Sequence, residues 1–237
     1  MARATEHTPL VDPAAGAQPP TSRRTLIAKI AVGVGLAGAL AWFAFSGSSS
    51  AHTPLAAASL SEPILLPPAV TEDTSFICDP DSTQDAGYIK LPNKEDGHYF
   101  YWYFESRSEP STDPLVLWLT GGPGGSSTMA LLTENGPCSI NATDLSTTLN
   151  PYSWTNNANV VWLDQPTSVG FSHGALNDTD YTEDDVGENI YWFLQGFLEK
   201  HPELDGREFF VTGESYGGHY VPAAAHYIWE QNQEHDA

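Results

Sequence analysis

Short apolar runs separated by turns follow one another through the second half of the chain. Three of them are continuous, in residues 114–120 (PLVLWLT), 159–164 (NVVWLD) and 209–212 (FFVT). Continuous apolar runs are typical of parallel strands that are covered on both faces. Two earlier runs, residues 87–92 (GYIKLP) and 98–106 (HYFYWYFES), also have the composition of strands. The pattern predicts a sheet built from these segments.

A helix is predicted between the last two strands. In residues 182–202 (TEDDVGENIYWFLQGFLEKHP), five apolar side chains fall on one helical face: Val186, Ile190, Phe193, Leu194 and Phe197. Thr182 and Asp185 have the spacing of a capping box, and Pro202 stands just beyond the expected end. Strand, helix and strand in this order indicate an α/β sheet.

The N-terminal part has a different pattern. Residues 1–24 form a polar tail, residues 25–45 an apolar segment, and residues 46–72 a stalk rich in Ser, Ala and Pro, which leaves 73–237 as the folded domain. The apolar segment predicts a signal anchor, with residues 26–45 crossing the membrane, or a cleaved signal peptide. The basic residues lie before it or at its start, so we expect a cytoplasmic N-terminus and a lumenal or exterior remainder.

Charge changes near the same place. Residues 1–50 carry four basic and two acidic residues, a net charge of +2, whereas residues 51–237 carry five basic and 28 acidic residues, a net charge of −23. A surface this acidic repels nucleic acids and anionic membranes, so nucleic acid is not expected as a partner, and the membrane is expected as one only through residues 26–45 if they are not cleaved off. Two sequons, at Asn141 and Asn177, suit an exported domain and are candidate glycosylation sites.

The stretch VTGESYGGHYVP contains a candidate nucleophile, Ser215. Gly213 to Gly217 match the pattern G-x-S-x-G, and they stand between a predicted strand and an Ala-rich stretch that reads as a helix. A nucleophile elbow needs this order, because a sharp turn between strand and helix lifts the serine hydroxyl above the sheet. The alternative is an ordinary tight connection with a capping serine.

A glycine-rich loop, residues 120–127 (TGGPGGSS), follows an earlier predicted strand. It lacks the spacing of phosphate-binding loops. Glycines also allow backbone N–H groups to point at a developing oxyanion. In an α/β-hydrolase this hole uses one N–H from such a loop and one from the residue after the nucleophile. Here these residues are Gly122 and Tyr216.

Four ordered blocks carry a family resemblance: LWLTGGPGGSS, ENGPCSI, NPYSWTNNANVVWLDQPTSVGFS and VTGESYGGHYVP. Together they resemble the serine carboxypeptidase family. The resemblance runs from about Cys78 to the last residue. It implies an α/β-hydrolase fold, a mostly parallel sheet with flanking helices, and a Ser-His-Asp triad that removes C-terminal residues from peptides and proteins. It implies no cofactor and no metal.

The resemblance also implies residue roles. Ser215 matches the nucleophile, and Trp118, Glu134 and Glu214 match positions that bind the substrate's terminal carboxylate. Thr120 belongs to the same group, but the family's peptidases commonly have Asn there, and Thr is similar to the pattern of its acyltransferase branch. Since two glutamates and a carboxylate bring three negative charges together, we expect raised carboxyl pKa values and stronger peptide binding at acidic pH.

Cys78 and Cys138 are a candidate disulfide, and the pairing stays open at this point. Gly125 stands where many family members have a disulfide-forming Cys, so the pattern of bridges differs from theirs. Two cysteines without a Cys/His cluster do not indicate a metal site.

The triad partners of Ser215 are not recognisable in this chain. His219, His226, His235 and Asp236 all follow Ser215, but they fall on the predicted elbow helix or at its end. In the family, Asp and His come from loops far downstream. We therefore expect a fold truncated after the elbow helix and an isolated chain that is inactive.

Three hypotheses follow: a serine carboxypeptidase of the secretory pathway, a related acyltransferase, or a non-catalytic membrane-anchored protein that binds peptides. The first is favoured. Its expected location is a type II membrane protein, or a secreted or lysosomal-vacuolar protein if the signal is cleaved.

Overall fold

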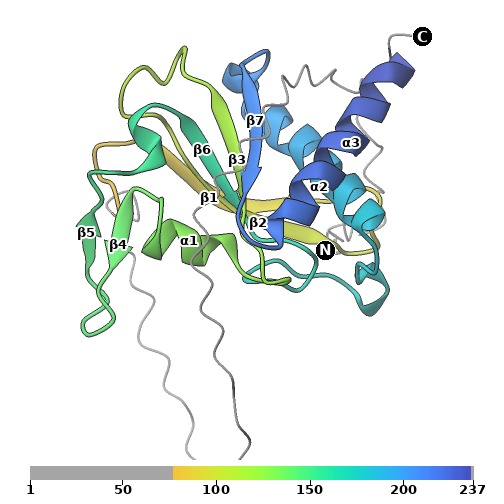
Figure 1. Cartoon of the computed structure of the whole chain (residues 1–237), viewed down its shortest axis with the longest axis horizontal. Helices are drawn as coiled ribbons and strands as arrows, with labels where there is room; N and C mark the ends of the chain where they lie inside the picture. The colour runs from red at the N-terminus through yellow and green to blue at the C-terminus, as the bar shows by residue number, and fades with distance from the viewer. Residues whose placement is uncertain (1–76, 236–237) are drawn as a thin grey trace, which may run out of the picture.

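The computed structural model of this chain describes residues 77–235. These residues form a five-stranded sheet in the order β1-β2-β6-β3-β7. The strands are β1 (Gln84–Lys90), β2 (His98–Phe104), β3 (Leu115–Leu119), β6 (Asn159–Leu163) and β7 (Phe209–Gly213). Every predicted strand segment therefore contributes a strand to one sheet (Figure 1).

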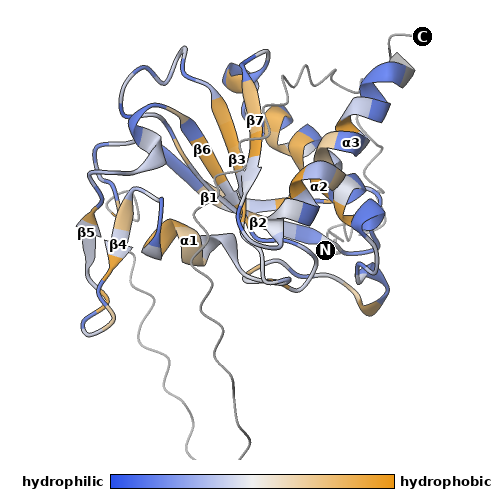
Figure 2. Cartoon of the chain, in the orientation of Figure 1, coloured by the Kyte–Doolittle hydropathy of each residue, from blue (hydrophilic) through white to orange (hydrophobic). Residues whose placement is uncertain are grey.

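The sheet is mixed. Strand β3 pairs in parallel with both β6 and β7, whereas β2 pairs antiparallel with β1 and β6. All residues of β3 and β6 are buried, as expected for strands covered on both faces. These continuous apolar strands stand out in the centre of the sheet in Figure 2. The prediction of parallel pairing for the three apolar runs is confirmed.

Two long helices cover one face of the sheet (Figure 1). Helix α2 (Glu183–Lys200) begins with a capping box, in which the Thr182 hydroxyl accepts from the Asp185 N–H and the Asp185 carboxylate accepts from the Thr182 N–H. The five apolar residues that the sequence places on its inner face are all buried. Helix α3 (Gly217–His235) follows β7 directly and packs beside α2.

The opposite face of β3 and β6 is covered by a short helix and a hairpin. Helix α1 (Ser127–Thr133) lies against β6, and the hairpin of β4 (Cys138–Ile140) and β5 (Thr147–Leu149) lies beside α1. The sequence did not predict this hairpin, because its strands have only three residues each. Three short 3-10 helices complete the described elements: Trp154–Asn156, Leu176–Asp178 and Pro202–Leu204.

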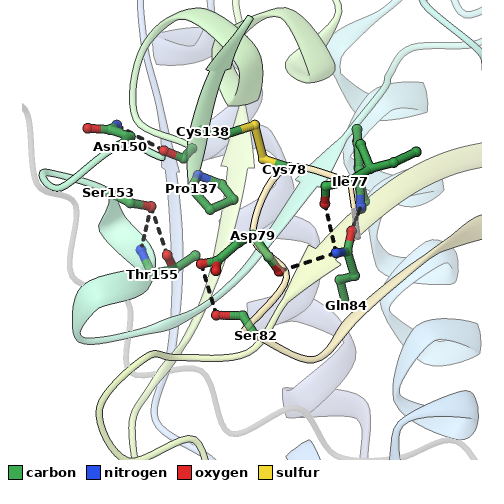
Figure 3. Close-up of a disulfide and its surroundings, with 12 residues drawn as sticks. Ile77, Cys78, Asp79, Ser82, Gln84, Pro137, Cys138, Asn150, Ser153 and Thr155 are labelled. Carbon is green, nitrogen blue, oxygen red and sulfur yellow. Dashed lines mark hydrogen bonds between the residues drawn. A yellow bond between two sulfur atoms is a disulfide. The ribbon is translucent and has the colours of Figure 1, made fainter. Parts of the chain in front are cut away.

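A disulfide joins Cys78 to Cys138, at the start of β4 (Figure 3). The neighbouring Arg107 side chain donates to the Asp79 carboxylate at 2.8 Å and to the carbonyl oxygens of Asn150 and Pro137, at 2.8 and 2.9 Å. The bridge and the guanidinium together tie the start of the described chain to the β4–β5 hairpin.

The predicted tail, apolar segment and stalk, residues 1–72, lie outside the described residues. Within residues 77–235, no helix combines the length and the apolar character that crossing a bilayer requires.

Candidate active site

Ser215 occupies a sharp turn between β7 and α3. Its backbone φ is 52°, in the left-handed region that residues other than glycine rarely adopt. The turn is closed by hydrogen bonds from the Gly217 N–H to the Glu214 carbonyl, 2.6 Å, and from the Gly218 N–H to the Ser215 carbonyl, 3.0 Å. Ser215 itself is exposed. This is the strained, outward-facing geometry of a nucleophile elbow.

The glycine-rich loop lies directly against this turn. A Cβ atom on Gly121 would stand 2.4 Å from the Tyr216 backbone nitrogen and 2.7 Å from the Glu214 carbonyl oxygen. A Cβ atom added to Gly213 or to Gly217 would stand 2.6 Å from the Leu119 carbonyl oxygen. Only residues without side chains permit this approach. The backbone of β3 and its loop is thereby brought next to the backbone that follows Ser215.

Contacts from several sides hold the loop in place. The Thr120 N–H donates to the Ser127 hydroxyl at 3.1 Å, and the Gly125 N–H donates to the Gly121 carbonyl at 2.8 Å. Gly122, the predicted oxyanion-hole residue, is exposed and has a φ of 120°, a conformation suited to glycine. These contacts hold the backbone of the loop in one conformation beside the elbow.

The predicted carboxylate-binding residues come from three neighbouring segments. Trp118 is the penultimate residue of β3, Glu134 caps the C-terminus of α1, and Glu214 follows β7. The Trp118 indole N–H donates to the Thr120 hydroxyl at 2.9 Å. Partial burial, and secondly the charge of Glu214, raise the pKa of the Glu134 carboxyl above its usual value of 4.5. The structure thus brings the two glutamates close enough to interact.

Among the described side chains, no histidine is hydrogen-bonded to the Ser215 hydroxyl. His219 is exposed on α3, where its ring stacks on Tyr216 with centroids 4.4 Å apart. His226 is also exposed on α3 and faces Glu230, with Nδ1 3.6 Å from the carboxylate. Neither forms a hydrogen bond to the Ser215 hydroxyl. The side chain of His235 and the whole of Asp236 lie outside the described residues.

The predicted glycosylation sites are both exposed. Asn141 begins the loop between β4 and β5, and Asn177 lies in the 3-10 helix Leu176–Asp178. The side-chain oxygen of Asn141 accepts from the Thr143 N–H at 2.9 Å. Neither site contacts the candidate active site.

Two further residues of the site were missed from the sequence. Asp164, fully buried after β6, accepts from the Ser126 hydroxyl at 2.6 Å and the Thr128 N–H at 3.2 Å. It thereby anchors the glycine-rich loop and the start of α1. Trp154 packs edge-on against Trp118 with ring centroids 4.9 Å apart. A polar residue at the carboxyl end of a parallel strand was the available signal for Asp164.

Comparison with known proteins agrees with this geometry. The profile of the serine carboxypeptidase family matches residues 74–237. The chain is 46% identical to serine carboxypeptidase 3 of Hordeum vulgare over 152 residues, which cover 64% of this chain and 30% of the relative. It is 47% identical to the vacuolar serine-type carboxypeptidase ATG42 of Saccharomyces cerevisiae over 153 residues, 64% of this chain and 29% of the relative.

A solved structure has the same architecture. Kex1, a prohormone-processing carboxypeptidase from Saccharomyces cerevisiae, superposes with a TM-score of 0.61 at 32% identity, covering 67% of this chain and 37% of Kex1. The predicted α/β-hydrolase fold is thereby confirmed. The matches cover about 30% of the length of the curated relatives. The chain belongs to the serine carboxypeptidase family.

Proposed function

We propose that this chain carries the nucleophile and the carboxylate-recognition part of a serine carboxypeptidase active site. The observation that carries the proposal is the exposed Ser215 in its left-handed turn, packed against the Gly121 backbone. Family membership supports the reaction class. The substrates would be the C-termini of peptides or proteins, and no cofactor takes part.

In the proposed reaction, the Ser215 hydroxyl attacks the carbonyl carbon of the last peptide bond. The backbone N–H groups of Gly122 and Tyr216 stabilise the oxyanion that forms. A general base takes the hydroxyl proton and delivers it to the leaving amine as the C–N bond breaks. Water then hydrolyses the acyl ester on Ser215 and regenerates the hydroxyl.

The described residues supply no such base to Ser215. A serine without its base retains only the acceleration given by binding and the oxyanion hole. We therefore propose that the base and its orienting acid lie outside residues 77–235. The chain by itself is expected to react slowly with a fluorophosphonate probe, since its hydroxyl is not activated.

Recognition of the substrate's end falls to Glu134 and Glu214, with Trp118 and Thr120 beside them. An ionised glutamate repels a terminal carboxylate, whereas a protonated one donates a hydrogen bond to it. Because the pKa of Glu134 is raised by burial and by Glu214, the protonated form persists to higher pH than in water. We propose peptide binding that is strongest at acidic pH, in an acidic compartment of the secretory pathway.

A chimeric enzyme tests the proposal. Yeast carboxypeptidase Y matches this chain over 149 residues, which is 27% of its length. Replacing those residues by their counterparts from this chain should give an enzyme that cleaves a blocked dipeptide and loses this activity in Ser215→Ala. A chimera that melts at the parental temperature but has no activity would refute the assignment of Ser215.

An acyltransferase is the second candidate, favoured by one observation at Thr120. Threonine has no side-chain amide to offer a substrate carboxylate, and the Thr120 hydroxyl already accepts from the Trp118 indole. If the acyl group on Ser215 passes to an alcohol, adding the alcohol to the chimera's assay will yield ester in preference to acid. Hydrolysis unchanged by the alcohol would exclude this alternative.

A further inference from the structure

One face of the β1–β2 hairpin is open in the described part of the chain. The odd-numbered side chains of β2, Tyr99, Tyr101 and Tyr103, point toward α2 and are at most 2% exposed. On the other face, Tyr88 of β1 is 47% exposed, and Phe171, from the turn after β6, is 59% exposed. The two sides of one hairpin therefore differ sharply in how well they are covered.

The open face is continuous and largely aromatic. We define it by five residues: Ala86, Tyr88, Phe100, Trp102 and Phe171. The Tyr88 ring meets the Phe100 ring edge-on with centroids 5.4 Å apart, and Phe100 meets Phe171 at 5.0 Å. Ala86 is exposed and stands opposite Trp102 in the hairpin register. Phe100 and Trp102 are half-buried, and Trp102 packs against the cluster that includes Ala130 and Leu131 of α1, so the uncovered part of this face centres on Tyr88 and Phe171.

A contiguous aromatic surface of this kind indicates a contact with another segment. The neighbouring strands show what a covered surface looks like, because every residue of β3 and β6 is buried between helices. A sheet in an α/β domain is stabilised by layers on both faces. Within residues 77–235, the part of the open face around Tyr88 and Phe171 lacks such a layer.

The described chain starts at the border of this face. The Ile77 carbonyl accepts from the Gln84 side-chain amide at 2.9 Å, and the Gln84 side-chain oxygen accepts from the Trp102 indole at 3.1 Å (Figure 3 shows Ile77 beside Gln84). Ile77 is therefore on the same side of the hairpin as Trp102. The point at which the described chain begins is therefore at the edge of the open face.

The segment shortly before Ile77 has a matching composition. Residues 63–70 read PILLPPAV, with no charge and three large aliphatic residues in succession, and six residues separate them from Ile77. From Gln84 to Tyr88 the hairpin extends by about 14 Å, at about 3.4 Å per residue. Six residues can span up to about 20 Å when extended. Residues 63–70 are therefore close enough in the chain, and apolar enough, to lie against the open face.

We propose that residues 63–70 of this chain pack across the open face of β1 and β2. Leu65 and Leu66 would bury their side chains against Tyr88, Phe100 and Phe171. The segment would form the missing layer over this half of the sheet and fix the direction in which the N-terminal part of the chain leaves the domain. It lies after the expected signal, so signal cleavage would leave the contact intact.

Photo-crosslinking in the full chain tests the proposal directly. Phe171 is replaced by p-benzoylphenylalanine, the protein is irradiated, and cross-linked peptides are identified by mass spectrometry. We expect the label to join to residues 63–70. The same label at Tyr152, which is 87% exposed and outside the open face, is the control and should not reach them. A second label at Tyr88 should repeat the result of the first.

The expected contact is also sensitive to charge. Leu65→Asp combined with Leu66→Asp should lower the cross-link yield roughly tenfold, because a carboxylate is costly to bury against aromatic rings. Mixing light and isotopically heavy protein shows whether a cross-link joins two copies. Cross-links between copies, or none from either labelled position in a folded chain, would overturn the proposal.

Discussion

Gly121→Ala is the sharpest test of how the site is built. The added Cβ atom would stand 2.4 Å from the Tyr216 nitrogen, 2.7 Å from the Glu214 oxygen and 2.9 Å from the Ser215 Cβ. An ordinary contact begins near 3.4 Å, so the loop and the elbow must separate by about 1 Å. Two of the three atoms belong to the backbone, and they cannot rotate away as a side-chain end can.

The energetic cost follows from that displacement. Overpacking a close contact by one methyl group typically costs about 1–3 kcal/mol. The upper part of that range applies here, because moving the loop also strains its hydrogen bonds to Gly125 and Ser127. We expect Gly121→Ala to lower the free energy of unfolding by about 2–3 kcal/mol.

Gly218→Ala is the matched control. Gly218 is the second residue of α3, and an added Cβ would meet nothing within 4 Å. The same chemical change there should stabilise the protein by up to about 1 kcal/mol, since alanine has less freedom in the unfolded chain and favours the helix.

Urea denaturation followed by circular dichroism measures both variants against the parent. Opposite shifts of the midpoint, with unchanged slopes, are expected. In the chimeric enzyme, Gly121→Ala should also lower kcat by about 100-fold, because a displacement of about 1 Å spoils the alignment of the oxyanion N–H groups. If Gly121→Ala unfolds at the parental urea concentration, the close packing of loop and elbow is wrong.

Four further substitutions have expected outcomes. The pKa of Glu134 is raised in the folded state, so its ionised form destabilises the fold above about pH 4.5 and not below it. Glu134→Gln should therefore raise the melting temperature at pH 7 more than at pH 4. Equal increases at the two pH values would contradict this. Arg107→Met should lower the free energy of unfolding, measured by urea denaturation, by about 3 kcal/mol, because the buried Asp79 carboxylate loses its partner. A loss below about 1 kcal/mol would show that the ion pair is dispensable. Asn141→Gln and Asn177→Gln should each make the expressed protein migrate faster on a gel, by the same step that endoglycosidase removes from one glycan of the parent. If a variant migrates like the untreated parent, that site carries no glycan.

The local elements of this fold were determined by the sequence alone. Three continuous apolar runs became the parallel strands β3, β6 and β7. The capping box of Thr182 and Asp185 and a one-sided apolar face fixed the start and the orientation of α2. The elbow was also predictable, since strand, serine turn and helix are neighbours in the chain. In each case the deciding interactions join residues a few positions apart, and periodicity and capping record such interactions directly.

The contacts that make a site were decided only by the tertiary structure. Gly121 meets the Tyr216 backbone across 95 positions of sequence, Asp164 anchors Ser126, and the charge of Glu214 reaches Glu134. The pairing of Cys78 with Cys138, which the sequence left open, is of the same kind. A sequence pattern shows which face of an element is apolar, but not which other element will lie against it. That choice depends on strand order and on the closeness that glycines allow, and both are set by the packing of the whole domain.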